Sequence, residues 1–221
     1  IEAARRSKVV IVVVGGSSAR DFKTSYKETG AAVAEEGSVS DMECGEGFDR
    51  ASLSLLGRQQ ELLESLQKTG KPLIVVYIEG RPLEKNWASE YADALLTAYY
   101  PGQEGGNAIA DVLFGDYNPS GKLTSTWYNA LSDLPNGMLN YDIRDAKYTY
   151  MYHDKTPLYP FGYGMSYTTF EYQKLNISKS RLAAGEELIV SADITNTGKY
   201  AGAEIVQLYA HVNSSIERPL K

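Results

Sequence analysis

The sequence predicts an α/β fold in its first half, a doubly wound and mostly parallel sheet, and an incomplete antiparallel β-sandwich after it. Two observations carry this prediction. Up to residue 115, continuous apolar runs alternate with segments of helical period, which is the order expected of a parallel sheet with crossover helices. From Phe170 onward, apolar and polar residues alternate with period two between turn residues, as antiparallel strands do.

Three strands are predicted in the first half. Residues 1–7 read as the last turns of a helix, and the β-branched run 8–14 that follows is predicted to be a strand buried on both faces of the sheet. The runs 73–78 and 94–98 are the second and third strands. Short connections between them predict right-handed parallel crossovers.

Two helices are predicted between and after these strands. The first covers residues 58–68 and ends before Gly70 and Pro72, a glycine cap followed by a proline stop. Its apolar face is predicted to consist of Leu62, Leu63 and Leu66. The next helix is predicted from Gln103 to Gly115, where the carboxylate of Glu104 suits the positive end of a helix dipole.

The second half changes character. We assign residues 1–127 to the α/β domain, 128–168 to a connector with no sustained period, and 169–221 to the β-sandwich. Strands are predicted at 188–194 and 204–210. Because about fifty residues are too few for a seven-strand sandwich, this domain is expected to be incomplete, and the chain is expected to be part of a larger protein.

Composition excludes several classes of protein. The 221 residues are 43% hydrophobic and 23% charged, which excludes a disordered or collagen-like chain. The net charge of −6 disfavours binding to nucleic acid or to an anionic membrane surface. The longest apolar run, residues 9–14, is far shorter than a transmembrane helix.

Metal and disulfide chemistry is disfavoured as well. The single cysteine, Cys44, excludes an internal disulfide, and His153 and His211 are the two histidines, too few for a zinc site to be expected. We therefore predict no metal and no cofactor. The 17 tyrosines against 5 phenylalanines suit a sugar-binding cleft and the exterior of a β-sandwich equally well.

The strongest candidate for chemistry is an acidic loop at residues 37–50, after the first strand. Glu43, Glu46 and Asp49 lie within seven residues, and Glu46 has a glycine on either side. A carboxyl group presented on such a loop acts as a general acid where apolar surroundings raise its pKa. The alternative is a solvated acidic loop in which Asp49 caps the following helix.

Other motifs are weaker. Cys44 has no histidine nearby to activate a thiolate. The segment 15–20 follows a strand but lacks the glycine spacing and the lysine of a phosphate-binding loop. Residues 101–106 most simply open a helix that packs closely, with anion binding as the weaker interpretation.

Four segments in this order resemble the second half of glycoside hydrolase family 3, the group of β-glucosidases and β-xylosidases. They are residues 44–50, 70–76, 100–121 and 159–170. The resemblance implies a (β/α)8-type barrel, then a six-stranded α/β sandwich domain, then a fibronectin-III-like β-sandwich. This chain would hold most of the second domain and the start of the third.

The resemblance also implies a retaining mechanism. A barrel Asp is the nucleophile, and a Glu of the α/β domain is the general acid/base. Glu46 matches the family's Gly-Glu-Gly signature, and Glu43 is the reserve candidate. The implied partners are a β-glucoside or oligosaccharide and the barrel, as a domain or a separate chain, without which this chain is expected to be inactive.

The resemblance favours an exo-acting β-glucosidase, exported to the periplasm or secreted, with a β-xylosidase of the same family as the alternative. Two hypotheses from other classes stay open on the residues alone. One is a non-catalytic carbohydrate-binding or scaffold protein with tyrosine-rich surfaces. The other is a small nucleotide-binding α/β protein.

Overall fold

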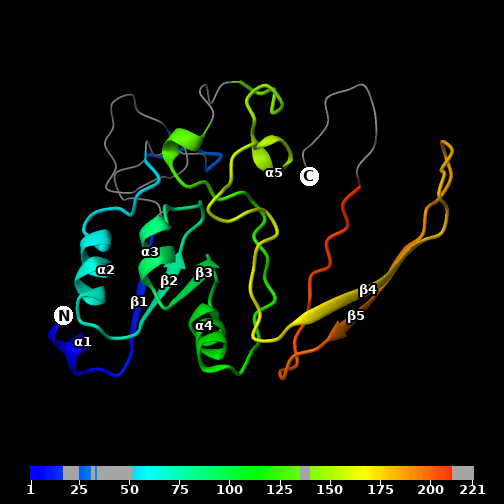
Figure 1. Cartoon of the computed structure of the whole chain (residues 1–221). Coiled ribbons are helices and arrows are strands. Elements are labelled where there is room, and N and C mark those ends of the chain that lie inside the picture. Colours follow the sequence, from blue (N-terminus) through cyan, green and yellow to red (C-terminus); the bar gives the residue numbers. More distant parts are fainter. Residues whose placement is uncertain (17–24, 31–32, 34–51, 135–139, 211–221) are drawn as a thin grey trace.

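A computed structural model describes residues 1–16, 25–30, 33, 52–134 and 140–210. The described chain forms a three-stranded parallel sheet with its helices and a two-stranded antiparallel sheet, joined by a long irregular segment (Figure 1). The predicted fold class, a parallel α/β sheet followed by antiparallel strands, is confirmed.

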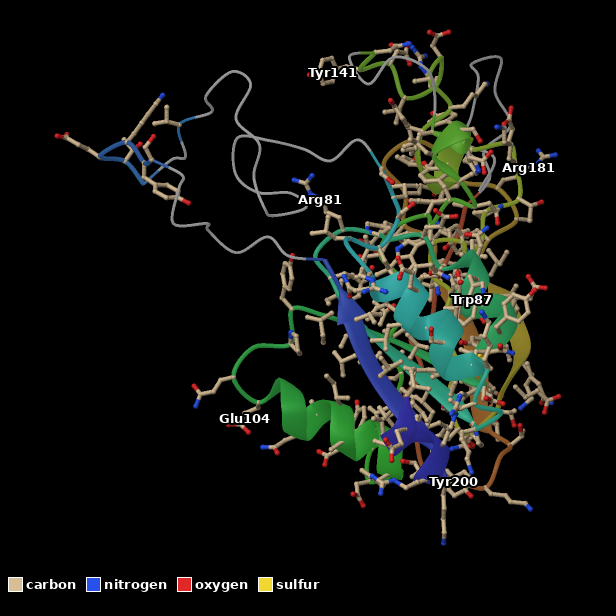
Figure 2. The ribbon with its side chains drawn as sticks, turned by 90° about the vertical axis from the view of Figure 1, so that its left-hand side faces the viewer. Arg81, Trp87, Glu104, Tyr141, Arg181 and Tyr200 are labelled. Carbon is tan, nitrogen blue, oxygen red and sulfur yellow. The ribbon has the colours of Figure 1, made fainter. Side chains whose placement is uncertain are left out.

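The parallel sheet consists of β1 (Val10–Gly15), β2 (Leu73–Ile78) and β3 (Ala94–Tyr99), in that order across the sheet. α1 (Glu2–Arg6) precedes β1, in agreement with the sequence. α2 (Gln59–Gln67) and α3 (Asn86–Tyr91) are the crossovers, and α4 (Gly105–Phe114) follows β3. In Figure 2, α2 and α4 lie on either side of β1, as a doubly wound sheet requires.

The core lies on one face of the sheet, under α1, α2 and α3. In β1, Val10, Val12 and Val14 are buried in this core, whereas Ile11 and Val13 are 45% and 60% exposed, and Val9 just before the strand is 45% exposed. The prediction that this strand is buried on both faces is therefore wrong for the described chain. β1 lies at the edge of the sheet, while the central strand β2 is the one with a nearly continuous buried run.

α2 shows a narrower apolar face than predicted. Leu63 and Leu66 are buried at 0% and 7% exposure, but Leu62 is 42% exposed. In a helix of 3.6 residues per turn, Leu63 and Leu66 lie on the face that points into the core. Leu62 lies at the margin of that face. Gly70 adopts a left-handed φ of 68° just after the helix, in agreement with the predicted glycine stop.

α3 was not predicted from the sequence. It has six residues, and Ala88 is the one buried side chain among them. A helix of under two turns shows no apolar period to read. α4 was predicted; it begins two residues later than expected and ends at Phe114, where the expected Gly115 caps it.

Gly115 allows a direct test of the α4 cap. Its φ of 86° is left-handed, so we expect Gly115→Ala to lower the free energy of unfolding by about 1–2 kcal/mol. Gly106→Ala is the matched control, since a Cβ there meets nothing within 4 Å and should stabilise the helix by up to about 1 kcal/mol. Urea unfolding of both variants checks this, and equal effects would contradict the cap.

The predicted connector folds back onto the first domain. Trp127 pairs with Tyr159 in an antiparallel bridge, and Leu123 exchanges backbone hydrogen bonds with Gly162 and Tyr163. η1 (Leu131–Asp133) and α5 (Thr149–Tyr152) are its short helices. The domain boundaries at residues 127 and 168 stay predictions.

The second sheet pairs β4 (Phe170–Ile177) with β5 (Val190–Asn196). β5 confirms the strand predicted at 188–194. The strand predicted at 204–210 is wrong for the described chain, because residues 201–210 form no strand. That segment is held by side chains instead, with Gln207 Nε2 donating to Gly162 O at 3.1 Å.

Candidate active site at the carboxyl edge of the sheet

The carboxyl ends of the three parallel strands meet at one edge of the sheet. Gly16 follows β1, residues 79–85 follow β2, and residues 100–104 follow β3. Open α/β sheets bind their ligands at this edge, so we take it as the candidate active site.

The predicted acid/base residues belong to the segment that leaves this edge after β1. Glu46 and its reserve Glu43 lie outside the described residues, as do Cys44 and Asp49. Their roles stay predictions. The chain on either side of them is described, and it indicates where the segment begins and ends.

Both ends of that segment lie at the carboxyl edge. At its start, Gly16 N donates to Ile78 O, the last residue of β2, at 3.2 Å. At its end, Leu53 O accepts from Glu84 N at 2.6 Å, and Ser54 Oγ donates to Glu84 Oε2 at 3.2 Å. The segment carrying Glu46 therefore leaves from, and returns to, the edge where a ligand is expected.

A buried ion pair lies directly beneath this edge. The carboxylate of Glu79, the residue after β2, accepts from Lys85 Nζ at 2.6 and 2.7 Å. Their side chains are 1% and 0% exposed. Glu79 also accepts from Leu83 N at 3.0 Å and, more weakly, from Thr97 Oγ1 at 3.4 Å. The pair thus fixes the loop 79–85, which in turn holds Leu53.

Aromatic rings enclose the ammonium of this pair. Lys85 Nζ lies 4.0 Å from the ring centroids of both Tyr77 and Trp127, close enough for cation–π attraction. Trp127 is 2% exposed. The rings of Tyr99 and Tyr159 pack edge-on against it, with ring centroids 6.5 and 6.4 Å from that of Trp127.

Burial sets the protonation behaviour of this cluster. Burial raises the pKa of Glu79, and the Lys85 ammonium acts in the opposite direction. Burial and the negative charge of Glu79 raise the pKa of Tyr77. Since substrate cannot reach side chains at 0–1% exposure, we assign the pair a structural role.

Sequence reasoning missed this pair. A signal for it existed, because Glu79 follows six apolar residues of a central strand with no intervening turn residue. A charge at that position is buried unless the strand ends early, so it needs a partner. Lys85, six residues on, was the cation to consider.

The segment 101–106 opens a closely packed helix, as the simpler of its two interpretations predicted. α4 begins at Gly105, where a Cβ would run into the ring of Pro101. Gly102 has a left-handed φ of 73°. The close packing predicted for this segment is confirmed.

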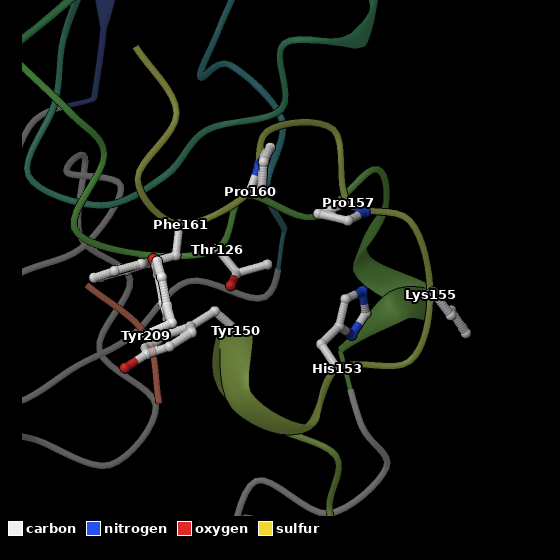
Figure 3. Close-up of a pocket in the computed structure, with 8 residues that line it drawn as sticks. All are labelled: Thr126, Tyr150, His153, Lys155, Pro157, Pro160, Phe161 and Tyr209. Carbon is white, nitrogen blue, oxygen red and sulfur yellow. The ribbon is translucent and has the colours of Figure 1, made fainter. Parts of the chain in front are cut away.

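A small cavity lies between the connector and the segment 201–210 (Figure 3). Thr126 lines it, with Tyr150, Phe161 and Tyr209 on one side and His153 on the other. Its volume of about 30 Å³ is enough for one water molecule, whereas small-molecule sites measure about 300–1,000 Å³. It therefore encloses no sugar ring.

The described residues hold neither a metal-binding cluster nor a membrane-spanning helix. Among the described residues, no group of three or more His, Cys, Asp or Glu side chains is placed to hold a metal ion. No helix there is both long and apolar enough to cross a bilayer.

The sequence of this chain matches a known protein family. Residues 1–167 match the family description "Glycosyl hydrolase family 3 C-terminal domain". The chain belongs to glycoside hydrolase family 3. The resemblance noted from four short segments is confirmed.

The relatives of this chain include proteins named for both expected activities. The chain is 42% identical over its whole length to a protein of Formosa agariphila named β-xylosidase. It is 37% identical, again over its whole length, to a periplasmic β-glucosidase of Salmonella typhimurium. These relatives are glycoside hydrolases.

A solved β-glucosidase structure shares the fold. The β-glucosidase of Erythrobacter marinus superposes on 99% of this chain with a TM-score of 0.77 at 35% identity, and the match covers 27% of that protein. The two curated relatives are covered over 28% and 27% of their length. The chain thus spans little more than a quarter of the family members that it matches.

Proposed function

We propose that this chain supplies the general acid/base of a retaining, exo-acting β-glycosidase that hydrolyses terminal β-D-glucosyl residues of oligosaccharides or glycosides. One observation carries the proposal. In a family 3 chain, the segment bearing Gly45, Glu46 and Gly47 begins and ends at the carboxyl edge of the parallel sheet, through Gly16 and Leu53. Open α/β sheets bind their ligands at that edge, which supports a carboxyl group of this segment as the acid/base.

The proposed reaction divides its two carboxyl groups between two parts of the enzyme. An Asp of the barrel attacks the anomeric carbon, while Glu46 protonates the leaving-group oxygen and later takes a proton from water. Retention requires the two groups about 5 Å apart, so the segment must reach across to the barrel. Glu43 is the reserve candidate for the acid/base.

The partners follow from this division. We use "complete enzyme" for this chain together with the barrel portion that carries the nucleophile, whether that portion is a domain or a separate chain. By analogy with the periplasmic β-glucosidase of Salmonella typhimurium, we place the complete enzyme in the periplasm or outside the cell.

A β-xylosidase of the same family is the second candidate. The observation that favours it is the 42% identity to the β-xylosidase of Formosa agariphila, against 37% to the Salmonella β-glucosidase. The ratio of kcat/KM for aryl β-glucosides and aryl β-xylosides distinguishes the two. A ratio above one supports the glucosidase, and the reverse supports the xylosidase.

The proposal as a whole is tested by assaying this chain with and without the barrel portion. We expect no glycoside hydrolysis by the chain alone, because it lacks the nucleophile. The complete enzyme should release sugar with retained anomeric configuration, observed by NMR of the first-formed product. Inversion would contradict the mechanism, and sugar binding without hydrolysis in either preparation would favour a carbohydrate-binding scaffold.

A further inference from the structure

The side chain of Asn118, four residues after α4, joins three separate stretches of the chain. Its Oδ1 accepts from Ser166 Oγ at 2.9 Å and from Tyr167 N at 2.8 Å. Its Nδ2 donates to Ala201 O at 2.9 Å. Ser166 and Tyr167 precede β4, and Ala201 follows β5. One amide of the α/β domain therefore holds the chain both before and after the second sheet.

The main chain approaches Asn118 too closely for a side chain to lie between them. A Cβ on Gly202, the residue after Ala201, would lie 2.6 Å from Asn118 Nδ2. In the same way, a Cβ on Gly164 would run into Gly121 O. Glycine permits such close approaches of one backbone to another segment, so the contact between these stretches is tightly packed.

Lys122 supplies a second tie between the same stretches. Its Nζ donates to Gly164 O at 2.8 Å and lies 3.5 Å from Glu204 Oε1. Both charged side chains are 15% exposed, so solvent ions screen their attraction less than that of a surface pair. We use "the joint" for Asn118 and Lys122 together with residues 164–167 and 201–204, which they hold.

Apolar packing does not fix the position of the second sheet in the described chain. No residue of β4 or β5 is buried, and Ile205, Val206 and Leu208 beyond them are 48%, 53% and 72% exposed. Domains of one chain move relative to each other unless their interface is large and hydrophobic. A fixed orientation here must therefore come from the polar contacts of the joint.

We propose that Asn118 holds the β4–β5 sheet in one fixed orientation on the α/β domain. Because its amide binds the chain on both sides of the hairpin, the hairpin cannot swing without breaking one of these hydrogen bonds. Lys122 is the secondary tie. The inference goes beyond the proposed function and does not depend on it, since the joint involves neither the acid/base nor the substrate.

Asn129 provides a matched control. It is half-buried like Asn118, and its Nδ2 donates to Thr156 O at 2.7 Å, 27 positions along the chain. Both partners of that bond lie within the connector. No hydrogen bond of Asn129 in the described chain reaches β4, β5 or the joint. Asn118→Leu and Asn129→Leu thus remove the same amide at different places.

The experiment measures the distance between two spin labels in the complete enzyme by pulsed EPR. The labels are attached at Gln67→Cys on α2 and Gln173→Cys on β4, two exposed positions, after the native cysteines, Cys44 included, are replaced by serine. The parent should give one narrow distance distribution. Asn118→Leu should broaden it about two-fold or more, because the hairpin is then free to swing. Asn129→Leu should leave its width within about a fifth of the parent's.

Two outcomes overturn the proposal directly. One is a broad distribution in the parent, and the other is an unchanged distribution in Asn118→Leu. Equal broadening by Asn118→Leu and Asn129→Leu would show general loosening of the chain, which also overturns it. The readout involves no glycoside hydrolysis, so failure of this inference leaves the proposed function untouched.

A second variant covers the case in which Asn118→Leu does not fold. In Asn118→Asp, the ionised carboxylate still accepts from Ser166 and Tyr167, but it donates nothing to Ala201 O. We expect this variant to broaden the distribution less than Asn118→Leu, and Lys122→Met combined with it to broaden the distribution further. Equal widths for Asn118→Asp and the control Asn129→Asp would contradict the role of Asn118.

Discussion

Glu46→Gln in the complete enzyme is expected to lower kcat/KM on glycosides with poor leaving groups by about 10²- to 10⁴-fold. Glutamine keeps the size of the side chain but has no proton to give to the departing oxygen. A dinitrophenyl leaving group departs without protonation, so its glycosylation step should be largely preserved. Steady-state kinetics on a series of aryl and alkyl glycosides measures the difference.

Azide provides the second readout for this variant. The small anion attacks the glycosyl-enzyme without needing the general base, so it should partly restore turnover and yield a glycosyl azide. Glu43→Gln is the matched control and should show neither effect. If the leaving-group dependence appears in Glu43→Gln instead, the reserve candidate is the acid/base, and equal loss on all substrates by both variants would move the assignment elsewhere.

Lys85→Met is expected to lower the free energy of unfolding by about 3–5 kcal/mol. The substitution removes the partner of the Glu79 carboxylate, which remains 1% exposed, and a buried charge without a partner is strongly unfavourable. Glu79→Leu combined with Lys85→Met should recover most of the loss, because it removes both charges. Urea unfolding of the two variants measures the effect.

An exposed ion pair provides the control for this experiment. Arg58 and Glu61 lie 2.8 Å apart, with side chains 88% and 63% exposed, and solvent screens such pairs. Arg58→Met should therefore change the unfolding midpoint far less than Lys85→Met. Similar losses from both substitutions would show that burial does not determine the contribution of the Glu79–Lys85 pair.

The stability of the Lys85→Met variant should also depend on pH. Burial raises the pKa of Glu79 in the folded state, and without the ammonium only the hydrogen bonds from Leu83 N and Thr97 Oγ1 oppose that shift. In the folded variant, the Glu79 carboxyl then keeps its proton to a higher pH than in the unfolded chain. The free energy of unfolding of the variant therefore falls as the pH rises from the ordinary glutamate pKa through the raised pKa of Glu79. Its deficit against the parent should be smaller at about pH 5 than at about pH 8.

The sequence supports a reliable prediction of the fold where a pattern is long enough. β2 is a central strand, and its apolar run was interpreted correctly. β1 has the same kind of run, but only one of its faces is buried in the core, so alternate residues are exposed, and local composition does not encode which faces of a strand are covered. α3 is too short to show a period, and the return of Tyr159 to Trp127 is a long-range contact without a local signal.

The candidate site divides in the same way. Glu46 is predicted from a motif, because glycines on both sides of a carboxylate form a local pattern, and its role stays a prediction. The hydrogen bond from Gly15 N to Gln59 Oε1 joins residues 44 positions apart, and the environment of Lys85 combines Tyr77 with Trp127. Interactions between distant residues of this kind become visible only when the chain is folded.

The bridge between Trp127 and Tyr159 has a practical consequence for protein engineering. Trp127 shields the Lys85 ammonium, and Tyr159 supports Trp127 from the segment that leads to the second sheet. A chimera spliced at residue 127 would strip that support and let water reach the charge beneath it. Module exchange between family members should therefore use a junction after Thr168, so that the connector 128–168 is inherited together with the parallel sheet against which it packs.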